Sequence, residues 1–194
     1  MKRIIVQLLL LILPIILWGQ VDSLLIEKRV VSMVDSSHSD NMVLIQTFEV
    51  NVPVEKVWEA YTTKKGWESW AVAQAKIDFK VNGLIQTSYD KNTEIGDSNT
   101  IRLHIINFVP KKLLTLQAEL SPHFPAFMKE DAKDLFNLVH FESITPTKTK
   151  IISYGIGYKK NKKYLDLMKF FISGNEASYL QLIAYLENGE VVKY

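Results

Sequence analysis

The 194-residue sequence contains no cysteine. The protein therefore has no disulfide bond, no thiolate nucleophile and no cysteine-ligated metal site, and it lacks the residue to which a lipoprotein attaches its lipid. Its stability has to come from packing instead. A hydrophobic content of 47% with 23% charged residues is typical of a folded globular chain, and the length fits one domain.

Signatures of common enzyme classes are also missing. No serine lies in a G-x-S-x-G motif, no phosphate-binding loop or dinucleotide fingerprint is present, and the four histidines show neither H-x-H nor H-x-x-x-H spacing. His104, His140 and Glu142 fall on expected strands and are the candidate acid–base groups. Solvent-exposed or hydrogen-bonded side chains are the simpler interpretation, so we expect no metal, no cofactor and no catalytic residue.

The longest apolar run lies at the N-terminus. Residues 1–3 are a short basic segment, residues 4–17 are apolar except for Gln7, and the chain turns polar at Asp22. This layout is typical of a secretory signal peptide, and the run is short for a membrane-spanning helix, which needs about 20 residues. We predict a signal peptide over residues 1–20 and export to the periplasm or beyond. An uncleaved N-terminal membrane anchor is the alternative.

The remaining chain has no excess of either charge. Loss of Lys2 and Arg3 with the signal peptide leaves 21 basic and 21 acidic residues. Nucleic-acid-binding domains usually carry a basic excess, so no nucleic acid is expected as a partner. Residues 159–163 include four lysines. They fit contact with anionic lipid headgroups or, more simply, a solvated turn before a helix.

The clearest local signals lie between residues 48 and 70. Alternation over residues 42–50 predicts a strand, and Pro53 favours a helix start because its fixed φ and missing N–H cost little in a first turn. Apolar residues then recur at helical spacing, at Val54, Val57, Trp58 and Tyr61. Residues 64–66 are expected to break this helix before a turn that carries two tryptophans.

The middle of the chain is predicted to form mostly strands, at about residues 75–81, 84–89, 100–109, 113–120, 135–144 and 150–158. Asn82-Gly83 predicts a two-residue hairpin turn. Segment 121–134 interrupts the series with two prolines and a brief helix from about residue 126. Residues 24–34 fit a strand or a short helix equally well.

An apolar stripe predicts a C-terminal helical region that ends near Asn188-Gly189. Gly174-Asn175 is expected to split it into a short helix and a longer final one. Antiparallel strands flanked by helices predict an α+β domain with a sheet of seven strands or slightly fewer. The sheet has one face to bury, and the final helix is the element long enough to cover it. The space between them is the expected place for a cavity.

The segment FEVNVPVEKVWEAYTTKKGWESW resembles the opening of the START-like (SRPBCC) superfamily, in particular the family named after the activator of heat shock protein 90 ATPase. The matching positions are Pro53, Val57, Trp58, Ala60 and Trp70. A strand running into Asn82-Gly83 and a leucine-rich final helix also match. The resemblance implies the helix-grip fold, a curved antiparallel sheet wrapped around a long C-terminal helix. It leaves function open, because members include lipid carriers, cyclases and co-chaperones.

These boundaries give a signal peptide over residues 1–20, a lead-in over 21–41, a START-like domain over 42–189 and a tail over 190–194. Our leading hypothesis is an exported, non-catalytic binder of a small hydrophobic molecule or lipid, held between the sheet and the final helix. The expected cavity residues are Trp67, Trp70, Tyr89, Tyr154, Phe171 and Tyr179. Trp70, a family motif position, is also well explained by packing of its helical turn onto the sheet.

Two alternatives remain open. A cyclase or hydrolase would use the same cavity with one of the acid–base candidates, and a buried histidine beside a carboxylate would favour it. A protein-interaction module, as in the co-chaperone members, would show a filled core beside an exposed apolar patch. Its partner is not identified by the sequence, and the cytosolic partner of those members conflicts with the export signal.

Overall fold

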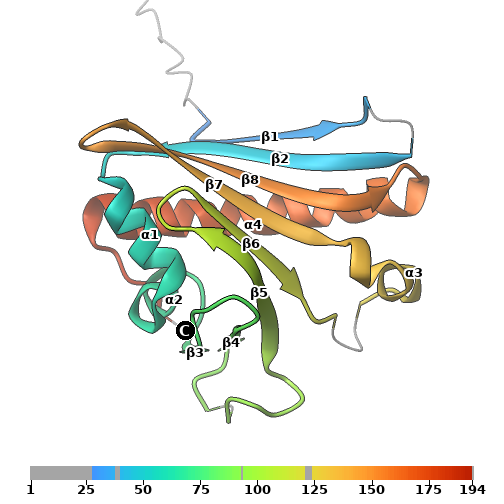
Figure 1. Cartoon of the computed structure of the whole chain (residues 1–194), viewed down its shortest axis with the longest axis horizontal. Coiled ribbons are helices and arrows are strands. Elements are labelled where there is room, and N and C mark those ends of the chain that lie inside the picture. The colour runs from blue at the N-terminus through green and yellow to red at the C-terminus, as the bar shows by residue number, and fades with distance from the viewer. Residues whose placement is uncertain (1–27, 38–39, 93, 121–123, 194) are drawn as a thin grey trace, which may run out of the picture.

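The structure, a computed structural model, describes residues 28–37, 40–92, 94–120 and 124–193. Eight antiparallel strands form one curved sheet in the order β1-β2-β8-β7-β6-β5-β4-β3 (Figure 1). The strands are β1 (Val30–Asp35), β2 (Asn41–Val50), β3 (Gln74–Ile77), β4 (Leu84–Ser88), β5 (Ile101–Val109), β6 (Leu113–Ala118), β7 (Phe136–Thr145) and β8 (Lys148–Lys159). The helices are α1 (Val54–Thr62), α2 (Lys64–Trp70), α3 (Ala126–Glu130), the 3-10 helix η1 (Ala132–Asp134) and α4 (Lys162–Asn188).

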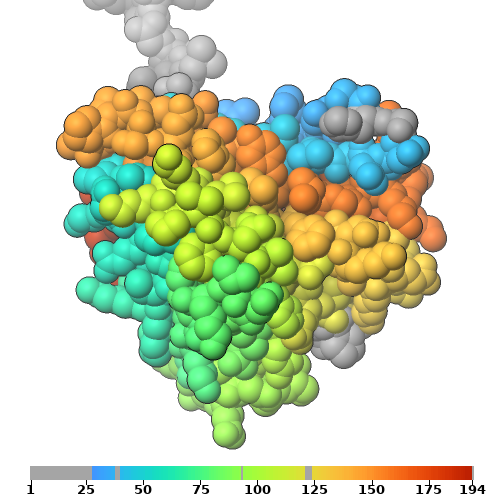
Figure 2. Space-filling model, viewed as in Figure 1, coloured from blue at the N-terminus to red at the C-terminus, as the bar shows by residue number. Residues whose placement is uncertain are grey.

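The arrangement confirms the helix-grip α+β fold. Helix α4 runs along one face of the sheet, with α1 and α2 near one end of the sheet and α3 near the other (Figure 1). Strands β3–β5 and their connecting loops form the tapered end of the molecule (Figure 2). Among the described residues no helix is both long and apolar enough to cross a membrane. The predicted signal peptide lies outside the described residues.

The alternation in β2 decides which face of the sheet is buried. The even-numbered residues from Leu44 to Val50 point to the helix side and are buried, whereas the odd-numbered residues between them are partly or fully exposed. Two clusters form the core on this side. The larger joins α1, α2, the middle of the sheet and the C-terminal half of α4, and the smaller joins α3, the ends of β2 and β8, and the N-terminal half of α4.

Helix α4 is continuous over 27 residues, so the predicted split at Gly174-Asn175 is wrong. A side chain at Gly174 would meet no atom within 4 Å, which places this glycine on an open part of the helix surface. The side chain of Asn175 donates a hydrogen bond of 2.8 Å to Gln46 in β2. The helix-breaking tendency of one glycine, about 1 kcal/mol, is therefore outweighed by the packing of α4 on the sheet. The helix ends as expected, at Gly189 in the left-handed conformation.

The predicted break at residues 64–66 is also wrong, because these residues form the first turn of α2. The break falls at Thr63, whose side chain accepts a hydrogen bond from the Gly66 backbone N–H and caps α2. Gly66 serves close packing, since a Cβ there would lie 2.5 Å from the carbonyl oxygen of Glu59 in α1.

Two further differences concern the strands. Residues 30–35 form the edge strand β1 paired with β2, so the sheet has eight strands and includes part of the expected lead-in. The Asn82-Gly83 turn is wider than predicted, because β3 ends at Ile77 and β4 begins at Leu84. Asn82 takes the left-handed conformation, and its backbone N–H donates to Ile105 of β5. This bond ties the loop to β5.

Candidate functional site

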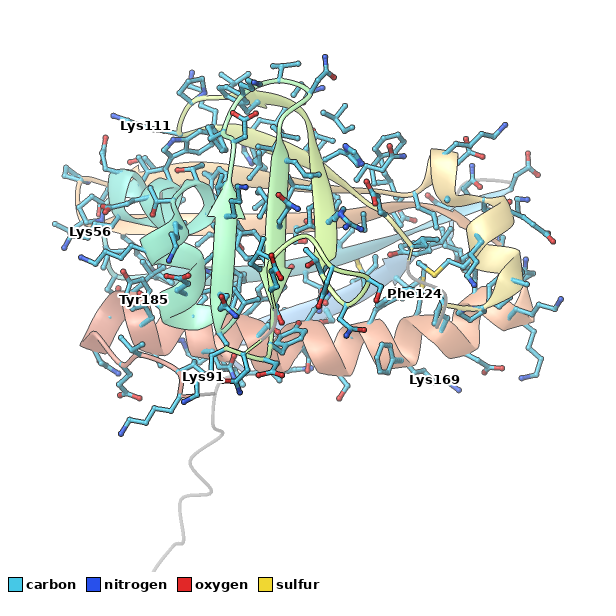
Figure 3. All side chains as sticks on the ribbon, turned by 90° about the horizontal axis from the view of Figure 1, so that it is seen from below. Lys56, Lys91, Lys111, Phe124, Lys169 and Tyr185 are labelled. Carbon is cyan, nitrogen blue, oxygen red and sulfur yellow. The ribbon has the colours of Figure 1, made fainter. Side chains whose placement is uncertain are left out.

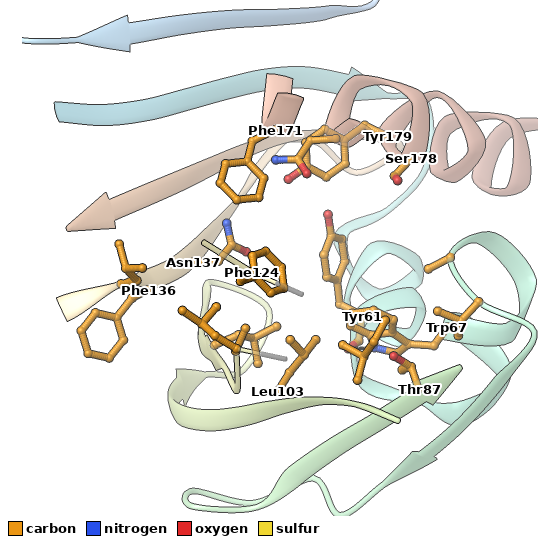
Figure 4. A pocket seen from close by; sticks show the side chains of 18 of the residues that line it. Tyr61, Trp67, Thr87, Leu103, Phe124, Phe136, Asn137, Phe171, Ser178 and Tyr179 are labelled. Carbon is orange, nitrogen blue, oxygen red and sulfur yellow. Dashed lines mark hydrogen bonds between the residues drawn. The ribbon is translucent and has the colours of Figure 1, made fainter. Parts of the chain in front are cut away.

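A cavity of about 320 Å³ lies between α4 and the sheet (Figure 4). It separates the two core clusters, because residues of the larger cluster, such as Leu116, and of the smaller one, such as Met128, both line it. Tyr89 lies at the rim of the cavity, and 61% of its surface is exposed. None of the 22 described lining residues has a charged side chain. The cavity therefore suits an apolar guest.

Five of the six residues predicted for this cavity line it: Trp67, Trp70, Tyr89, Phe171 and Tyr179. Tyr154 does not. Burial alternates along β8, with Ile151 and Ser153 facing the helix side, and this places Tyr154 on the opposite face of the sheet. The strand was predicted correctly, but the face of the sheet on which Tyr154 lies was predicted incorrectly.

The two tryptophans form the wall nearest α1 and also hold α1 and α2 together. The indole N–H of Trp67 donates to the carbonyl of Tyr61 at 2.7 Å, and that of Trp70 donates to the carbonyl of Ala60 at 3.1 Å. These carbonyls belong to the last turn of α1, where no further helical N–H is available. Because their polar atoms are satisfied by backbone, the indoles contribute apolar surface to the cavity. The packing and cavity interpretations of Trp70 therefore both apply.

The opposite wall comes from the segment that interrupts the strand series. Phe124 (Figure 4) and Met128 line the cavity from this segment, and Leu135 lines it directly after the segment ends. It is fixed by Asp131, which is 6% exposed, forms an ion pair with Lys159 of β8 and accepts a hydrogen bond of 2.9 Å from the hydroxyl of Tyr164 in α4. Seen from below, Phe124 lies on the inner side of α4 and Lys169 on its outer side (Figure 3).

Most polar side chains of the lining are paired with protein groups. The Asn137 amide donates to Ser153 at 2.9 Å, and Ser153 also hydrogen-bonds the hydroxyl of Tyr179. Asn175 begins a chain of hydrogen bonds that leads outward through Gln46 and Ser32 to Glu176. Lys28 closes this chain at the surface, and its contact with Glu176 lowers the pKa of that carboxyl. Such pairing fixes the wall in one arrangement.

Tyr61 differs from these residues. Its side chain is 3% exposed, and its hydroxyl has no hydrogen-bond partner among the described residues. Burial raises the pKa of this hydroxyl, so it stays protonated. Figure 4 shows it directed into the space between α4 and β5. The sequence placed Tyr61 on the apolar face of α1, but helical spacing cannot show whether a buried hydroxyl finds a partner.

The acid–base candidates lie away from the cavity. Leu103 and Ile105 face inward from β5, so His104 between them faces outward, where it lies 2.7 Å from Glu119 with both side chains more than 40% exposed. His140 and Glu142 likewise lie on the outer face of β7, alternating with buried Val139 and Phe141. No group of three His, Asp or Glu suitable for a metal ion occurs within the described ranges.

The lysines of residues 159–163 are engaged within the protein. Lys159 pairs with Asp131, Lys160 donates to the Ser36 carbonyl, and Lys162 pairs with Asp166. Lys163 lies 5.6 Å from the centre of the Phe127 ring. Lys159 ends β8, whereas Lys162 and Lys163 begin α4, so the cluster spans the junction of the two elements and extends beyond the turn that the sequence predicted.

Comparison with known proteins agrees with the resemblance seen in the sequence. The profile of the family described as Activator of Hsp90 ATPase homolog 1-like protein matches residues 51–187. A comparison with curated proteins finds no match.

Among solved structures, the Aha1 dimer from Colwellia psychrerythraea has a TM-score of 0.61 at 16% identity, covering 76% of this chain and 97% of that one. The protein SSP2350 from Staphylococcus saprophyticus gives 0.59 at 15%, covering 78% and 96%. CalU16 from Micromonospora echinospora gives 0.55 at 14%, covering 84% of both chains. These likenesses show the fold, and the family match extends over well more than half of the sequence. The chain therefore belongs to the Activator of Hsp90 ATPase homolog 1-like family of the START-like (SRPBCC) superfamily.

Proposed function

We propose that this protein is a non-catalytic binder of a small hydrophobic molecule, which it holds in the cavity between α4 and the sheet. The observation that carries the proposal is the apolar cavity of about 320 Å³, lined by aromatic side chains and by no charged group among the described residues. An apolar guest would cover the aromatic and aliphatic side chains of the wall, and each Å² of apolar surface removed from water contributes about 25 cal/mol.

The two alternatives have less support. A cyclase or hydrolase needs an acid–base group at the cavity, whereas His104, His140 and Glu142 face away from it. An interaction module with a filled core does not explain a cavity that divides the core in two.

Binding is tested with the neutral fluorophore N-phenyl-1-naphthylamine. Ser178 lines the cavity from α4, and Ser173 is an exposed serine of the same helix outside the lining. We expect Ser178→Trp to fill part of the cavity and weaken probe binding at least tenfold, and Ser173→Trp to leave it unchanged. No binding by the unmodified protein would contradict the proposal, and equal binding by both variants would place the probe elsewhere.

Native mass spectrometry of protein purified from its own host, followed by solvent extraction, would identify the natural guest. The same spectra test export, which the proposal takes from residues 1–20. We expect a chain that begins at residue 20 or 21. An intact N-terminus in the membrane fraction would favour the anchor instead, and an intact N-terminus in the cytosol would contradict export.

A further inference from the structure

The hydroxyl of Tyr61 is a buried polar group of the cavity wall that the described residues leave without a hydrogen bond. It is the buried side-chain oxygen that has no hydrogen-bond partner within the described part of the chain. A buried hydroxyl without a partner is unfavourable by about 1–3 kcal/mol, so native proteins keep such groups rarely. Its position at the cavity wall, directed inward (Figure 4), indicates that the missing partner belongs to the guest.

The direction of this hydroxyl is fixed by the packing of its ring. The ring of Tyr61 lies 5.4 Å from that of Trp70 and 5.3 Å from that of Phe141, both inclined to it, and the Tyr61 carbonyl is held by the Trp67 indole. A donor that cannot turn away is preorganised for an acceptor placed opposite it. The ring contacts thus position the hydroxyl before any guest arrives.

The surroundings also define the charge of the guest. Three polar groups of the lining are already paired, Asn137 and Tyr179 with Ser153 and Asn175 with Gln46. No lining residue among those described carries a positive charge that would offset the desolvation of an anion. A tyrosine hydroxyl kept protonated by burial offers one hydrogen-bond donor.

We propose that Tyr61 donates a hydrogen bond to an uncharged oxygen of the ligand, so that the cavity selects apolar molecules with a carbonyl or ether oxygen over plain hydrocarbons and over anions. This inference rests on the proposed function, because it names the ligand class of the same cavity. The ligand lies with its oxygen at the end of α1 and its apolar body between Leu103, Phe124 and Phe171.

Three probes with the same ring system test this selection: 2-ethylnaphthalene, 2-acetylnaphthalene and 2-naphthoate. They differ in having no oxygen acceptor, a neutral acceptor and an anionic acceptor. Each is titrated by displacement of N-phenyl-1-naphthylamine, and its affinity is corrected for its partition between water and cyclohexane. We expect the ketone to bind about threefold to tenfold more tightly than the ethyl compound, the range of one neutral hydrogen bond. The carboxylate should bind at least tenfold more weakly than the ketone.

Tyr61→Phe removes the hydroxyl and keeps the ring. We expect this variant to lose the preference for the ketone and to bind the ethyl compound as before. Its midpoint of thermal unfolding without probe should be unchanged or higher, because the hydroxyl has no hydrogen-bond partner among the described residues. A fall of several degrees would show that the hydroxyl has a structural partner and would overturn the inference.

The outcomes separate the two proposals. If all three probes bind equally well and Tyr61→Phe changes nothing, the selection by Tyr61 is wrong and the cavity remains a hydrophobic binding site. If the carboxylate binds most tightly, the neutral ligand class is wrong. If no probe displaces the fluorophore and none binds directly, both this inference and the proposed function are overturned.

Discussion

Individual side chains in this protein hold the fold together and shape the cavity at the same time. The two tryptophans cap the backbone of α1 with their N–H groups and give their ring faces to the cavity. Asp131 fixes the wall that contains Met128. Substitutions at such positions will change stability and binding together, which is why the binding tests above use Ser178 and Tyr61.

Residue-scale prediction from the sequence succeeded where a residue's place in the family fold decides its direction, as for Phe171 and Tyr179. It failed for Tyr154, because a strand has period two and an error of one residue moves a side chain to the other face. The role of Tyr61 at the cavity was not predicted, for another reason. Its burial follows from helical spacing, but its unpaired hydroxyl depends on neighbours from distant parts of the chain.

Asp131 gives a testable pH dependence. The hydrogen bond from Lys159, and then that from Tyr164, hold the pKa of Asp131 below its ordinary value of about 3.9. The folded state therefore binds this proton less readily than the unfolded state. The resulting stabilisation is fully present above the ordinary pKa and is lost as the pH falls below it, through the folded pKa. We expect Asp131→Asn to lower the thermal midpoint at pH 7, and the difference from the unmodified protein to shrink below about pH 4.

The matched control is Asp166→Asn on the surface of α4. Asp166 pairs with Lys162, but its side chain is 52% exposed, so we expect a smaller loss at pH 7. Unfolding followed by circular dichroism from pH 7 to pH 3 measures both variants. A loss at Asp131 that is no larger than the loss at Asp166, or that persists unchanged at pH 3, would show that the ion pair does not fix the α3 segment.

At the scale of elements, tertiary packing overrides the local signals of the sequence. Glycine and asparagine in the middle of α4 predicted a break, yet the helix continues and is anchored by buried residues on both sides of this point, at Met168 and at Tyr179. The alternation of β2 was informative for the opposite reason, since its pattern and its packing agree. Element boundaries such as the Thr63 break depend on caps and close contacts that a periodicity cannot show.

Two glycines in opposite environments test whether tertiary packing overrides the local preference of the residue. Gly174 of α4 has open space where a Cβ would lie, so we expect Gly174→Ala to raise the free energy of unfolding by about 0.5–1 kcal/mol. Gly157 of β8 has a φ of +88°, and a Cβ there would lie 1.8 Å from the Asp134 carbonyl oxygen. Gly157→Ala should lower the free energy of unfolding by more than about 1 kcal/mol. Urea denaturation measures both, and a destabilised Gly174→Ala would mean that α4 needs its glycine.

At the scale of the whole molecule, the antiparallel pairing of strands joined by short turns was predictable from the sequence, whereas the pairing of β2 with β8, from opposite ends of the chain, was not. The number of strands in the sheet could not be predicted from the sequence either. Residues 24–34 show no decisive periodicity, and the family resemblance starts only near residue 42. The contacts that make β1 part of the domain reach across the chain, from Lys28 to Glu176 and from Arg29 to Glu187. Sequence-local reasoning has no access to such contacts.

Removal of β1 tests whether the domain begins where the sequence or the structure places its start. A chain starting at residue 41 loses Val30, which is 2% exposed, together with both ion pairs to α4, and it leaves the edge of β2 unpaired. We expect its free energy of unfolding to fall by at least about 2 kcal/mol relative to a chain starting at residue 28, from the burial of Val30 alone. The bare edge of β2 should also promote self-association, visible by size-exclusion chromatography. Equal stability and equal elution of the two chains would show that β1 is dispensable, because the remaining seven strands and α4 would then hold the core without it.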